Sequence, residues 1–232
     1  MTGLLAPRLT RPWLVADLGA PHRVLSFAPH NPGFVTAQTL VWREVKNADL
    51  PEGMDFSAWF AGELARAGLS ASVAMLTARD IGTWRAARAE VGGVTVECLA
   101  TVGLGNAEAL GPRRPTRRPE TAPAPGTINI ALRLSEGLTD TALLEALSIA
   151  ASARAATVLA SGVTLADGRA ALGTGTDCLA LAAPAGEGAF AGLHTALGEA
   201  IGRAVSAAVG QGCADWVAEN GLRADGYPED LI

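Results

Sequence analysis

The chain has 232 residues, of which 49% are hydrophobic and 18% charged, and its formal net charge is -5. This composition excludes wholesale disorder, which needs low hydrophobicity and high net charge. The acidic balance also argues against general nucleic-acid binding, which needs a surplus of Lys and Arg. The length suits one domain with a sizeable core, so we expect residues 1–232 to fold as a single domain.

The three cysteines, Cys98, Cys178 and Cys213, are odd in number and widely spaced. Both features argue against a disulfide framework and a structural zinc site, and they favour the reducing cytoplasm. The histidines form no HxH or HxxxH pair, so we expect no metal site, and a chain of this length needs no cofactor to fold. The N-terminal segment lacks the apolar region of a signal peptide, and no apolar run is long enough to predict a membrane span.

The first half of the chain is rich in predicted strands. Its apolar, β-branched or alternating segments are typical of strands, and one segment carries apolar residues at helical spacing. The predicted strands are His22–Phe27, Val35–Val45, Ala71–Leu76 and Val94–Val102, and the predicted helix is Asp55–Ala67.

The second half combines strands with two long helices. We predict strands at Thr127–Leu134 and Asp177–Ala183, and helices at about Asp140–Ala160 and Leu193–Asn220. Thr139 is a plausible N-cap of the first helix, because its hydroxyl can accept a hydrogen bond from the first turn.

Three residues interrupt the pattern of these helices. Arg154 places one charge on the otherwise apolar face of the first helix. In the second helix, Gly210 and Gly212 are expected to break or bend it, because glycine is a poor helix former.

Residues 111–126 hold five prolines and four arginines. No packed element can run through such a segment, so we expect a long exposed loop there. The strands around it occur in neighbouring pairs joined by short turns, which favours antiparallel pairing. The predicted fold is a layered α+β fold with a mainly antiparallel sheet. Two long C-terminal helices and a shorter helix from the first half cover that sheet.

Four short polar motifs stand out, and three of them lie at predicted strand ends. They are residues 101–106, 126–129, 173–177, and His194-Thr195 with Glu199. Glycine allows a ligand to approach the main chain, while Thr, Asn and Asp supply hydrogen bonds, so the motifs could form a polar pocket at a sheet edge. Taken one at a time, each motif is also typical of an ordinary turn. The candidate binding residues are Thr101, Asn106, Thr127, Gly173, Thr174, Gly175, Thr176 and Glu199.

His194 lies where the last helix is expected to begin. The positive end of a helix disfavours a charged imidazole, so His194 could accept a proton as a general base. The alternative is a capping or solvent-exposed histidine. Neither a phosphate-binding loop, a complete dinucleotide-binding GxGxxG motif, nor a G-x-S-x-G nucleophile elbow is present.

Seven strings occur together in a characteristic order. The first half contains VLSFAPHNPGF, AMLTARD and ATVGLGNA, and the second contains PGTINIAL, LTDTALLEAL, GTGTDCLALA and HTALGEAIGRAV. This ordered set resembles the adenosylcobinamide amidohydrolase family over about residues 22–210. The resemblance implies hydrolysis of the amide between the propionyl arm of a corrin ring and aminopropanol, giving adenosylcobyric acid during corrinoid salvage. The partner is then a small-molecule corrinoid that carries its own cobalt, and a homo-oligomeric state is left open.

The chain departs from the family pattern at several positions. Ser152, Ala153 and Arg154 stand where the family usually has Glu-Ala-Lys, and Trp42 stands where an Asn is frequent. Residues 31–33 replace a glycine-rich loop. These departures raise the alternative of a protein that binds corrinoids without hydrolysing them.

Amide hydrolysis needs an activated water or nucleophile and a site that stabilises an oxyanion. We expect Asp177 or His194 to activate water, and Asn129 with backbone N–H groups of residues 173–176 to bind the oxyanion. Thr127, Thr176 and Asn106 would hold the side-chain amides of the corrin. A further alternative is an amidohydrolase or acyltransferase for another amide, whose N-terminal-nucleophile form needs autocleavage before a threonine such as Thr127.

Overall fold

The computed structural model describes residues 5–46, 49–50, 53–111 and 126–224, and a strongly bent eight-stranded sheet is its framework. The strands follow the order β4-β3-β2-β11-β8-β6-β5, and β1 pairs with β2. These strands are β1 (Ala6–Thr10), β2 (Trp13–Ser26), β3 (Gly33–Glu44), β4 (Val73–Thr77), β5 (Arg85–Val91), β6 (Val94–Val102), β8 (Ile128–Leu134) and β11 (Cys178–Ala183).

In the described residues, the remaining named elements are three α-helices, a short 3-10 helix and two small strand pairs. The helices are α1 (Phe56–Arg66), α2 (Asp140–Ala160) and α3 (Ala196–Asn220), with the 3-10 turn at Ile81–Thr83. The small pairs are β7 (Ala107–Glu108) with β10 (Gly173–Thr174) and β9 (Thr164–Leu165) with β12 (Arg223–Ala224).

Strand β2 turns the sheet back on itself. Its pairing with β3 is interrupted between Asp17 and His22, where Gly19 adopts a φ of 79°. Before this break β2 pairs with β1, and after it β2 pairs with β11. A glycine suits the break because a positive φ costs it little. One continuous sheet therefore forms two facing parts, β1–β4 and β5, β6, β8 and β11.

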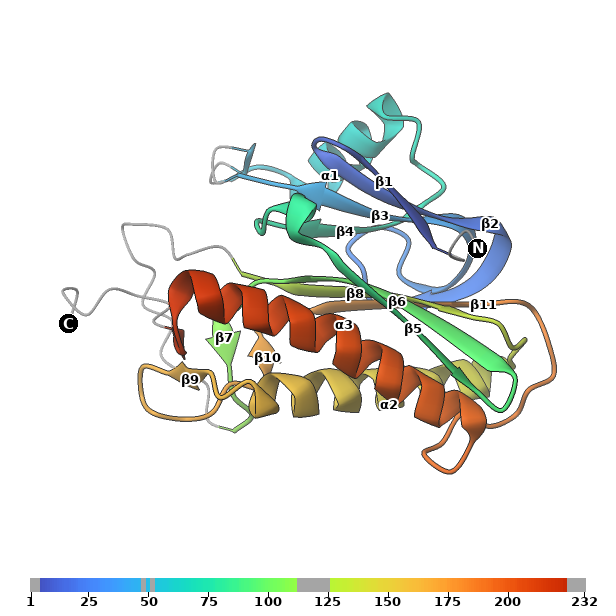
Figure 1. The fold of residues 1–232 in the computed structure, drawn as a ribbon. Coiled ribbons are helices and arrows are strands. Elements are labelled where there is room, and N and C mark those ends of the chain that lie inside the picture. Colours follow the sequence, from blue (N-terminus) through green and yellow to red (C-terminus); the bar gives the residue numbers. More distant parts are fainter. Residues whose placement is uncertain (1–4, 47–48, 51–52, 112–125, 225–232) are drawn as a thin grey trace.

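The two parts of the sheet form the inner layers of a four-layer arrangement. Figure 1 shows α1 on the outer side of β1–β4, and α2 and α3 on the outer side of the other part. Apolar clusters fill each interface: Phe60 and Leu64 of α1 pack on β2–β4, and a second cluster including Trp42 lies between the facing parts. The largest cluster joins α2 and α3 to β6, β8 and β11.

Small residues allow α3 to lie close to the sheet. A Cβ atom on Gly212 would stand 2.5 Å from a methyl group of Val102 in β6, so this glycine permits the contact. The helix runs without interruption through Gly210 and Gly212, so the expectation of a break there is wrong. Both helices are instead held by packing of many alanines against β-branched and leucine side chains.

By length and hydropathy alone, α2 could cross a membrane, and it is the one such helix in the described ranges. In the structure, however, it packs against α3 and β11. Its buried residues, which include Leu143 and Val158, belong to the largest apolar cluster. Of the most apolar 18-residue window of α2, 28% is buried, so α2 covers the apolar cluster with one face.

The fold class predicted from the sequence is confirmed: the sheet is largely antiparallel, and the two long helices follow it late in the chain. The helix Asp140–Ala160 and its N-cap Thr139 also agree with the prediction. The parallel pairs β3–β4 and β8–β11 were not expected, nor were β1, β5 and the first half of β2. The loop predicted at 111–126 lies mostly outside the described residues, which resume at Gly126.

Candidate active site

Three of the four polar motifs meet at one edge of the sheet. Strands β8 and β11 are parallel and adjacent, so Thr127 and Asp177, which immediately precede them, lie side by side. Strand β6 runs antiparallel to β8, which brings its last residues to the same edge. Thr101 of β6 is paired directly with Asn129 of β8. Residues 101–106, 126–129 and 173–177 therefore lie close together at this edge.

Asp177 joins several of the segments that meet at this edge through its hydrogen bonds. One carboxylate oxygen accepts hydrogen bonds from the Ile128 backbone N–H at 3.1 Å and from the Thr174 hydroxyl. The other accepts from the Thr174 backbone N–H at 3.0 Å and from the guanidinium of Arg154. A carboxylate offers about four acceptor positions, and these four bonds occupy them. Asp177 thus fixes the turn before β11 to the start of β8 and keeps no acceptor position for a water.

Burial governs the titration of Asp177. Its side chain is only 7% exposed. Loss of hydration raises the pKa of this carboxyl above its ordinary value of 3.8, although Arg154 and the bonds from Thr174 and Ile128 oppose the rise. A raised pKa by itself would suit a general base. The saturated oxygens nevertheless favour a positioning role for Asp177.

Arg154 was recognised in the sequence only as an interruption of an apolar face and a departure from the family pattern. Its Nη1 atom bonds Asp177 and also donates to the Leu172 carbonyl at 3.3 Å. A Cβ atom on Gly173 would stand 1.8 Å from that Nη1 atom, so only glycine fits beside the ion pair. A lone charge on a buried helix face needs a partner of opposite charge. A search of the sequence for such a partner of Arg154 could have suggested Asp177.

A chain of hydrogen bonds crosses the edge from Asn106 to Thr127. The side-chain N–H of Asn106 donates to the Thr176 hydroxyl at 3.3 Å, and the hydroxyls of Thr176 and Thr127 are hydrogen bonded to each other. Thr127 is 6% exposed, whereas Thr176 is exposed. The chain therefore links the buried Thr127 hydroxyl to the surface through Thr176.

Several buried polar atoms at this edge have no partner among the described residues. Asn129 donates to the Leu76 carbonyl of β4 at 2.7 Å, but its side-chain oxygen is unpaired. The hydroxyl of Thr101 and the side-chain oxygen of Asn106 are unpaired as well. Thr101 and Asn129 are both 0% exposed. Such atoms cost about 1–3 kcal/mol each when left without a partner, so they are typical of a site that receives a ligand or water.

The backbone N–H groups expected to bind an oxyanion are already engaged. The N–H of Thr174 bonds Asp177, that of Gly175 bonds the Asn106 carbonyl at 3.4 Å, and that of Thr176 bonds the Thr174 hydroxyl at 3.4 Å. The N–H groups of residues 174–176 therefore already have acceptors in Asp177, Asn106 and Thr174. An oxyanion bound by this turn would have to displace these acceptors.

Two other backbone N–H groups are free and stand close to Gly126. A Cβ atom at Gly126 would lie 2.6 Å from the Gly105 nitrogen and 2.9 Å from the Asn106 nitrogen. Neither N–H has an acceptor in the described ranges. Only glycine can occupy position 126 against these nitrogens, and the pair offers two donors to a carbonyl oxygen bound beside them. Residues 101–106 are among the motifs expected to form the polar pocket, but their backbone N–H groups were not predicted as donors to an oxyanion.

His194 and Glu199 lie at the other end of the sheet, so the structure does not bring the fourth motif to this edge. His194 is exposed and precedes the N-cap Thr195 of α3. Gly212, which contacts β6 near Thr101, lies 17 residues after Thr195 in the helix, which is about 25 Å of helix rise. Glu199 is paired with Arg203 on the helix surface. A mechanism in which Asp177 and His194 act on one bond does not fit this separation.

The family departures fall in different environments. Trp42 is fully buried in the cluster between the facing parts of the sheet, and Ser152 is exposed on α2. Asn31 adopts a φ of 53° and donates to the Ser72 carbonyl at 2.8 Å. Only Arg154 of these departures takes part in the polar edge.

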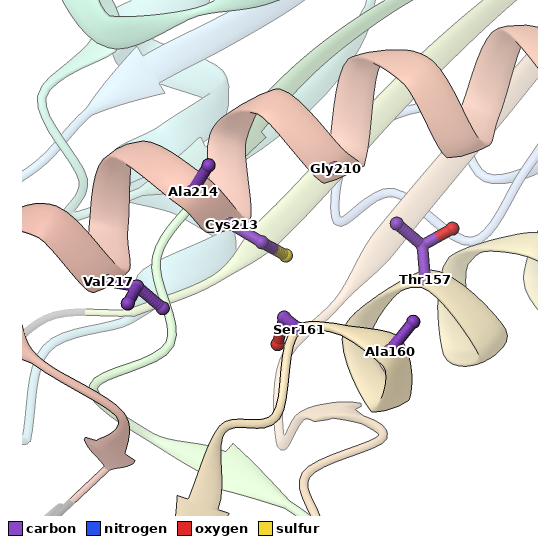
Figure 2. Close-up of a pocket in the computed structure, with 7 residues that line it drawn as sticks. All are labelled: Thr157, Ala160, Ser161, Gly210, Cys213, Ala214 and Val217. Atoms are coloured by element: carbon purple, nitrogen blue, oxygen red, sulfur yellow. The ribbon is translucent and has the colours of Figure 1, made fainter.

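The cysteines are buried and their thiols are held neutral. Cys213 lines a cleft between α2 and α3 with Thr157 and Ser161 (Figure 2). Burial raises the pKa of Cys213 to about 11 and that of Cys178 to about 12. Because the thiolate is the nucleophilic form, neither is suited to attack an amide at neutral pH. Within the described ranges, no group of three or more His, Cys, Asp or Glu side chains is arranged to hold a metal ion.

Comparison with known proteins gives a family and a distant structural likeness. The model of the adenosylcobinamide amidohydrolase family matches residues 5–221. Among solved structures, a Burkholderia sp. beta-aminopeptidase aligns with a TM-score of 0.40 and 14% sequence identity, covering 91% of this chain and 87% of that chain. No curated protein matches the sequence.

Proposed function

Because the chain belongs to the adenosylcobinamide amidohydrolase family, we propose that it hydrolyses the linear amide between the propionyl arm of adenosylcobinamide and aminopropanol. The products are adenosylcobyric acid and 1-aminopropan-2-ol, and the reaction serves corrinoid salvage in the cytoplasm. The observation that carries the proposal is the gathering of three family motifs into one buried polar edge with unpaired acceptors and free donors.

The chemistry of the edge suits an amide. The N–H groups of Gly105 and Asn106 are two donors for the scissile carbonyl, and the same groups would stabilise the oxyanion that forms on attack. The unpaired oxygens of Asn129 and Thr101 are acceptors for an amide N–H. The side-chain N–H of Asn129 already donates to the Leu76 carbonyl. Its unpaired atom is the side-chain oxygen, which we assign to N–H groups of the substrate and not to the oxyanion.

Arg154 argues for the hydrolase over a protein that only binds corrinoids. The family usually has Lys at this position, and Arg keeps the positive charge there. That charge meets Asp177 and completes the hydrogen bonds to its carboxylate. The departure at this position therefore preserves the arrangement of Thr127, Thr174 and Thr176.

The test is turnover of adenosylcobinamide by the purified chain, with adenosylcobyric acid measured by liquid chromatography and mass spectrometry. We expect Asn106→Ala to lower kcat/KM about tenfold or more, because it removes the side-chain N–H that bonds Thr176 and the unpaired side-chain oxygen, while the backbone donor stays in place. The matched control is Asn31→Ala, which removes an asparagine from a loop held by Ser72 and is expected to leave kcat/KM within about threefold. Absence of product from the wild-type chain would refute the proposal, and corrinoid binding without product would support the binding-only alternative.

A further inference from the structure

The described polar edge contains two buried hydroxyls, those of Thr101 and Thr127, and of the two only that of Thr127 is connected to the surface by a hydrogen bond, through Thr176. A threonine hydroxyl needs an adjacent base to attack an amide at a catalytic rate, whereas a single slow attack within the chain can pass its proton to water. Among the described residues, the only hydrogen-bond partner of this hydroxyl is the hydroxyl of Thr176, which is not basic. Asp177 has its acceptor positions filled, and His194 lies at the far end of α3. The folded chain therefore holds a nucleophile without a base.

We infer that the chain cleaves its own Gly126–Thr127 peptide bond, and that the α-amine released on Thr127 is the missing base. This inference deepens the proposed function, because it names the nucleophile and base for the same site. A free N-terminal threonine carries its amine two bonds from the carbon that bears the hydroxyl. Its ordinary pKa of about 7.7–8.0 leaves a substantial neutral fraction near pH 7.5.

The surroundings of the bond support self-cleavage. In the described ranges the N–H groups of Gly105 and Asn106 have no acceptor, and their nitrogens lie 2.6 and 2.9 Å from where a Cβ of Gly126 would stand. We assign them as donors to the oxyanion formed from the Gly126 carbonyl. Thr127 is held in place from the opposite side, because its carbonyl accepts from the Gly103 N–H at 3.1 Å and its hydroxyl bonds Thr176. The residue before the nucleophile must be glycine, since any side chain would collide with the two donors.

The reaction balances as the addition of one water to one peptide bond. The Thr127 oxygen attacks the Gly126 carbonyl carbon and loses its proton to water by way of Thr176. The bond from that carbon to the Thr127 nitrogen breaks, the nitrogen takes a proton, and an ester joins Gly126 to the Thr127 oxygen. Water then hydrolyses the ester, leaving a Gly126 carboxylate and a Thr127 with a free hydroxyl and a free amine.

The same groups can then act on the substrate amide. The Thr127 amine takes the hydroxyl proton as the oxygen attacks the amide carbonyl, and it returns the proton to the departing aminopropanol nitrogen. Water finally releases the carboxylic acid from the acyl-threonine. Two steps of nucleophilic catalysis thus replace one difficult hydrolysis.

The topology allows the two pieces to remain one folded body. After cleavage, β11 and β8 belong to the second piece and are flanked by β2 and β6 of the first. The β6–β8 ladder and the β2–β11 ladder both join the pieces. Helix α3 of the second piece packs on β5 and β6 of the first. Cleavage therefore removes one covalent bond but leaves the sheet and its buried clusters in place.

The test is the intact mass of the purified full chain under denaturing conditions. We expect two pieces, one ending at Gly126 and one beginning at Thr127, whose masses add up to that of the chain plus one water. A single stable species of the full 23.6 kDa would overturn the inference. Thr127→Ser should still cleave, whereas Thr127→Ala should stay intact and keep a wild-type circular dichroism spectrum. Cleavage of the Ala variant at the same bond would show an outside protease and also overturn the inference.

The assay of adenosylcobinamide separates this inference from the proposed function. An intact chain that forms adenosylcobyric acid would overturn self-cleavage and leave the proposed function standing. A chain that cleaves at Thr127 but forms no product would support self-cleavage and refute the proposed substrate. If the wild-type chain both cleaves itself and forms adenosylcobyric acid, Thr127→Ala is expected to lower kcat at least about a hundredfold, since both nucleophile and base are lost.

Discussion

The two ends of the part of the sheet formed by β8 and β11 carry similar residue types but differ in how those residues are held. At the end where these strands begin, Thr127 is buried, the side chains of Asp177 and Arg154 are 7% and 19% exposed, and all three are bonded to one another or to neighbouring segments. At the opposite end, His194 is exposed and Glu199 pairs within its own helix. Polar residues that are largely buried and hydrogen bonded to their neighbours define the candidate site, whereas a local polar motif at a helix start does not.

The largest expected difference concerns two Arg–carboxylate pairs, one at each end. Arg154→Met removes the partner of Asp177 and leaves a buried carboxylate, which we expect to lower the free energy of unfolding by about 3–5 kcal/mol. Arg203→Met removes the partner of Glu199, whose side chain is 46% exposed, and should cost less than about 0.5 kcal/mol. Urea unfolding of both variants measures the two values. Equal losses would contradict the distinction between the ends.

Alanine substitution of Gly173 and of Gly202 extends the comparison of the two ends, with a smaller expected change in stability. Gly173→Ala would force the new methyl group against Arg154, and we expect a loss of about 1–3 kcal/mol from this overpacking. Gly202→Ala on α3 places its methyl group in open space and should stabilise the helix by up to about 1 kcal/mol. Thermal unfolding should therefore shift in opposite directions. A lower melting temperature for Gly202→Ala would show that close packing, and not helix propensity, governs that face of α3.

The difference between the ends also explains what the sequence could predict. The strand Val94–Val102 and the helix Asp140–Ala160 follow from the spacing of their apolar residues. Strand β6 is nevertheless buried on both faces, which its alternating sequence does not indicate. The meeting of residues 101–106, 126–129 and 173–177 could be anticipated from glycines and threonines at strand ends. The contact of Arg154 with Asp177 depends on the parallel pairing of β8 and β11, which no local pattern encodes.

Strand β5 and the first half of β2 show a second reason why some strands could not be predicted from the sequence. The arginine-rich β5 alternates between half-buried and exposed residues and lies at the edge of the sheet, so its apolar signal is weak. The first half of β2 is buried on both faces between α1 and the second part of the sheet. Its role depends on the bend after Asp17, which the sequence marks only by Gly19. Tertiary packing decides such segments more than local propensity.

Two buried ion pairs in different layers should respond to pH with opposite signs. Arg43 lowers the pKa of Glu63 below its ordinary value of 4.5, chiefly by a hydrogen bond, so the unfolded chain binds the proton more tightly there. This pair contributes stability above about pH 4.5 that is lost as the pH falls through the lowered pKa. Burial instead raises the pKa of Asp177 above 3.8. Its titration then favours the folded state at low pH, and that contribution is lost as the pH rises through the raised pKa.

The measurement is the free energy of unfolding from pH 3 to pH 7 for the wild type, Glu63→Gln and Asp177→Asn. The advantage of the wild type over Glu63→Gln should grow with pH, while its advantage over Asp177→Asn should shrink. If both differences grew with pH, Arg154 and the N–H donors would outweigh burial at Asp177. The contact of Asp177 with Arg154 would then act as a stabilising ion pair, and burial would not favour the protonated form of Asp177.

The smallest expected effect is at His194. It stands about 25 Å of helix rise from the level of Thr101, and it is exposed ahead of the N-cap. We therefore expect His194→Ala and Glu199→Gln to leave kcat/KM within about threefold of wild type, since neither side chain can reach the site proposed for the amide at Gly105 and Asn106. Loss of a general base would cost about a hundredfold or more. A loss of that size in His194→Ala with an unchanged melting temperature would identify His194, at the far end of α3, as the general base. The polar edge would then bind corrin amides but would not catalyse their hydrolysis.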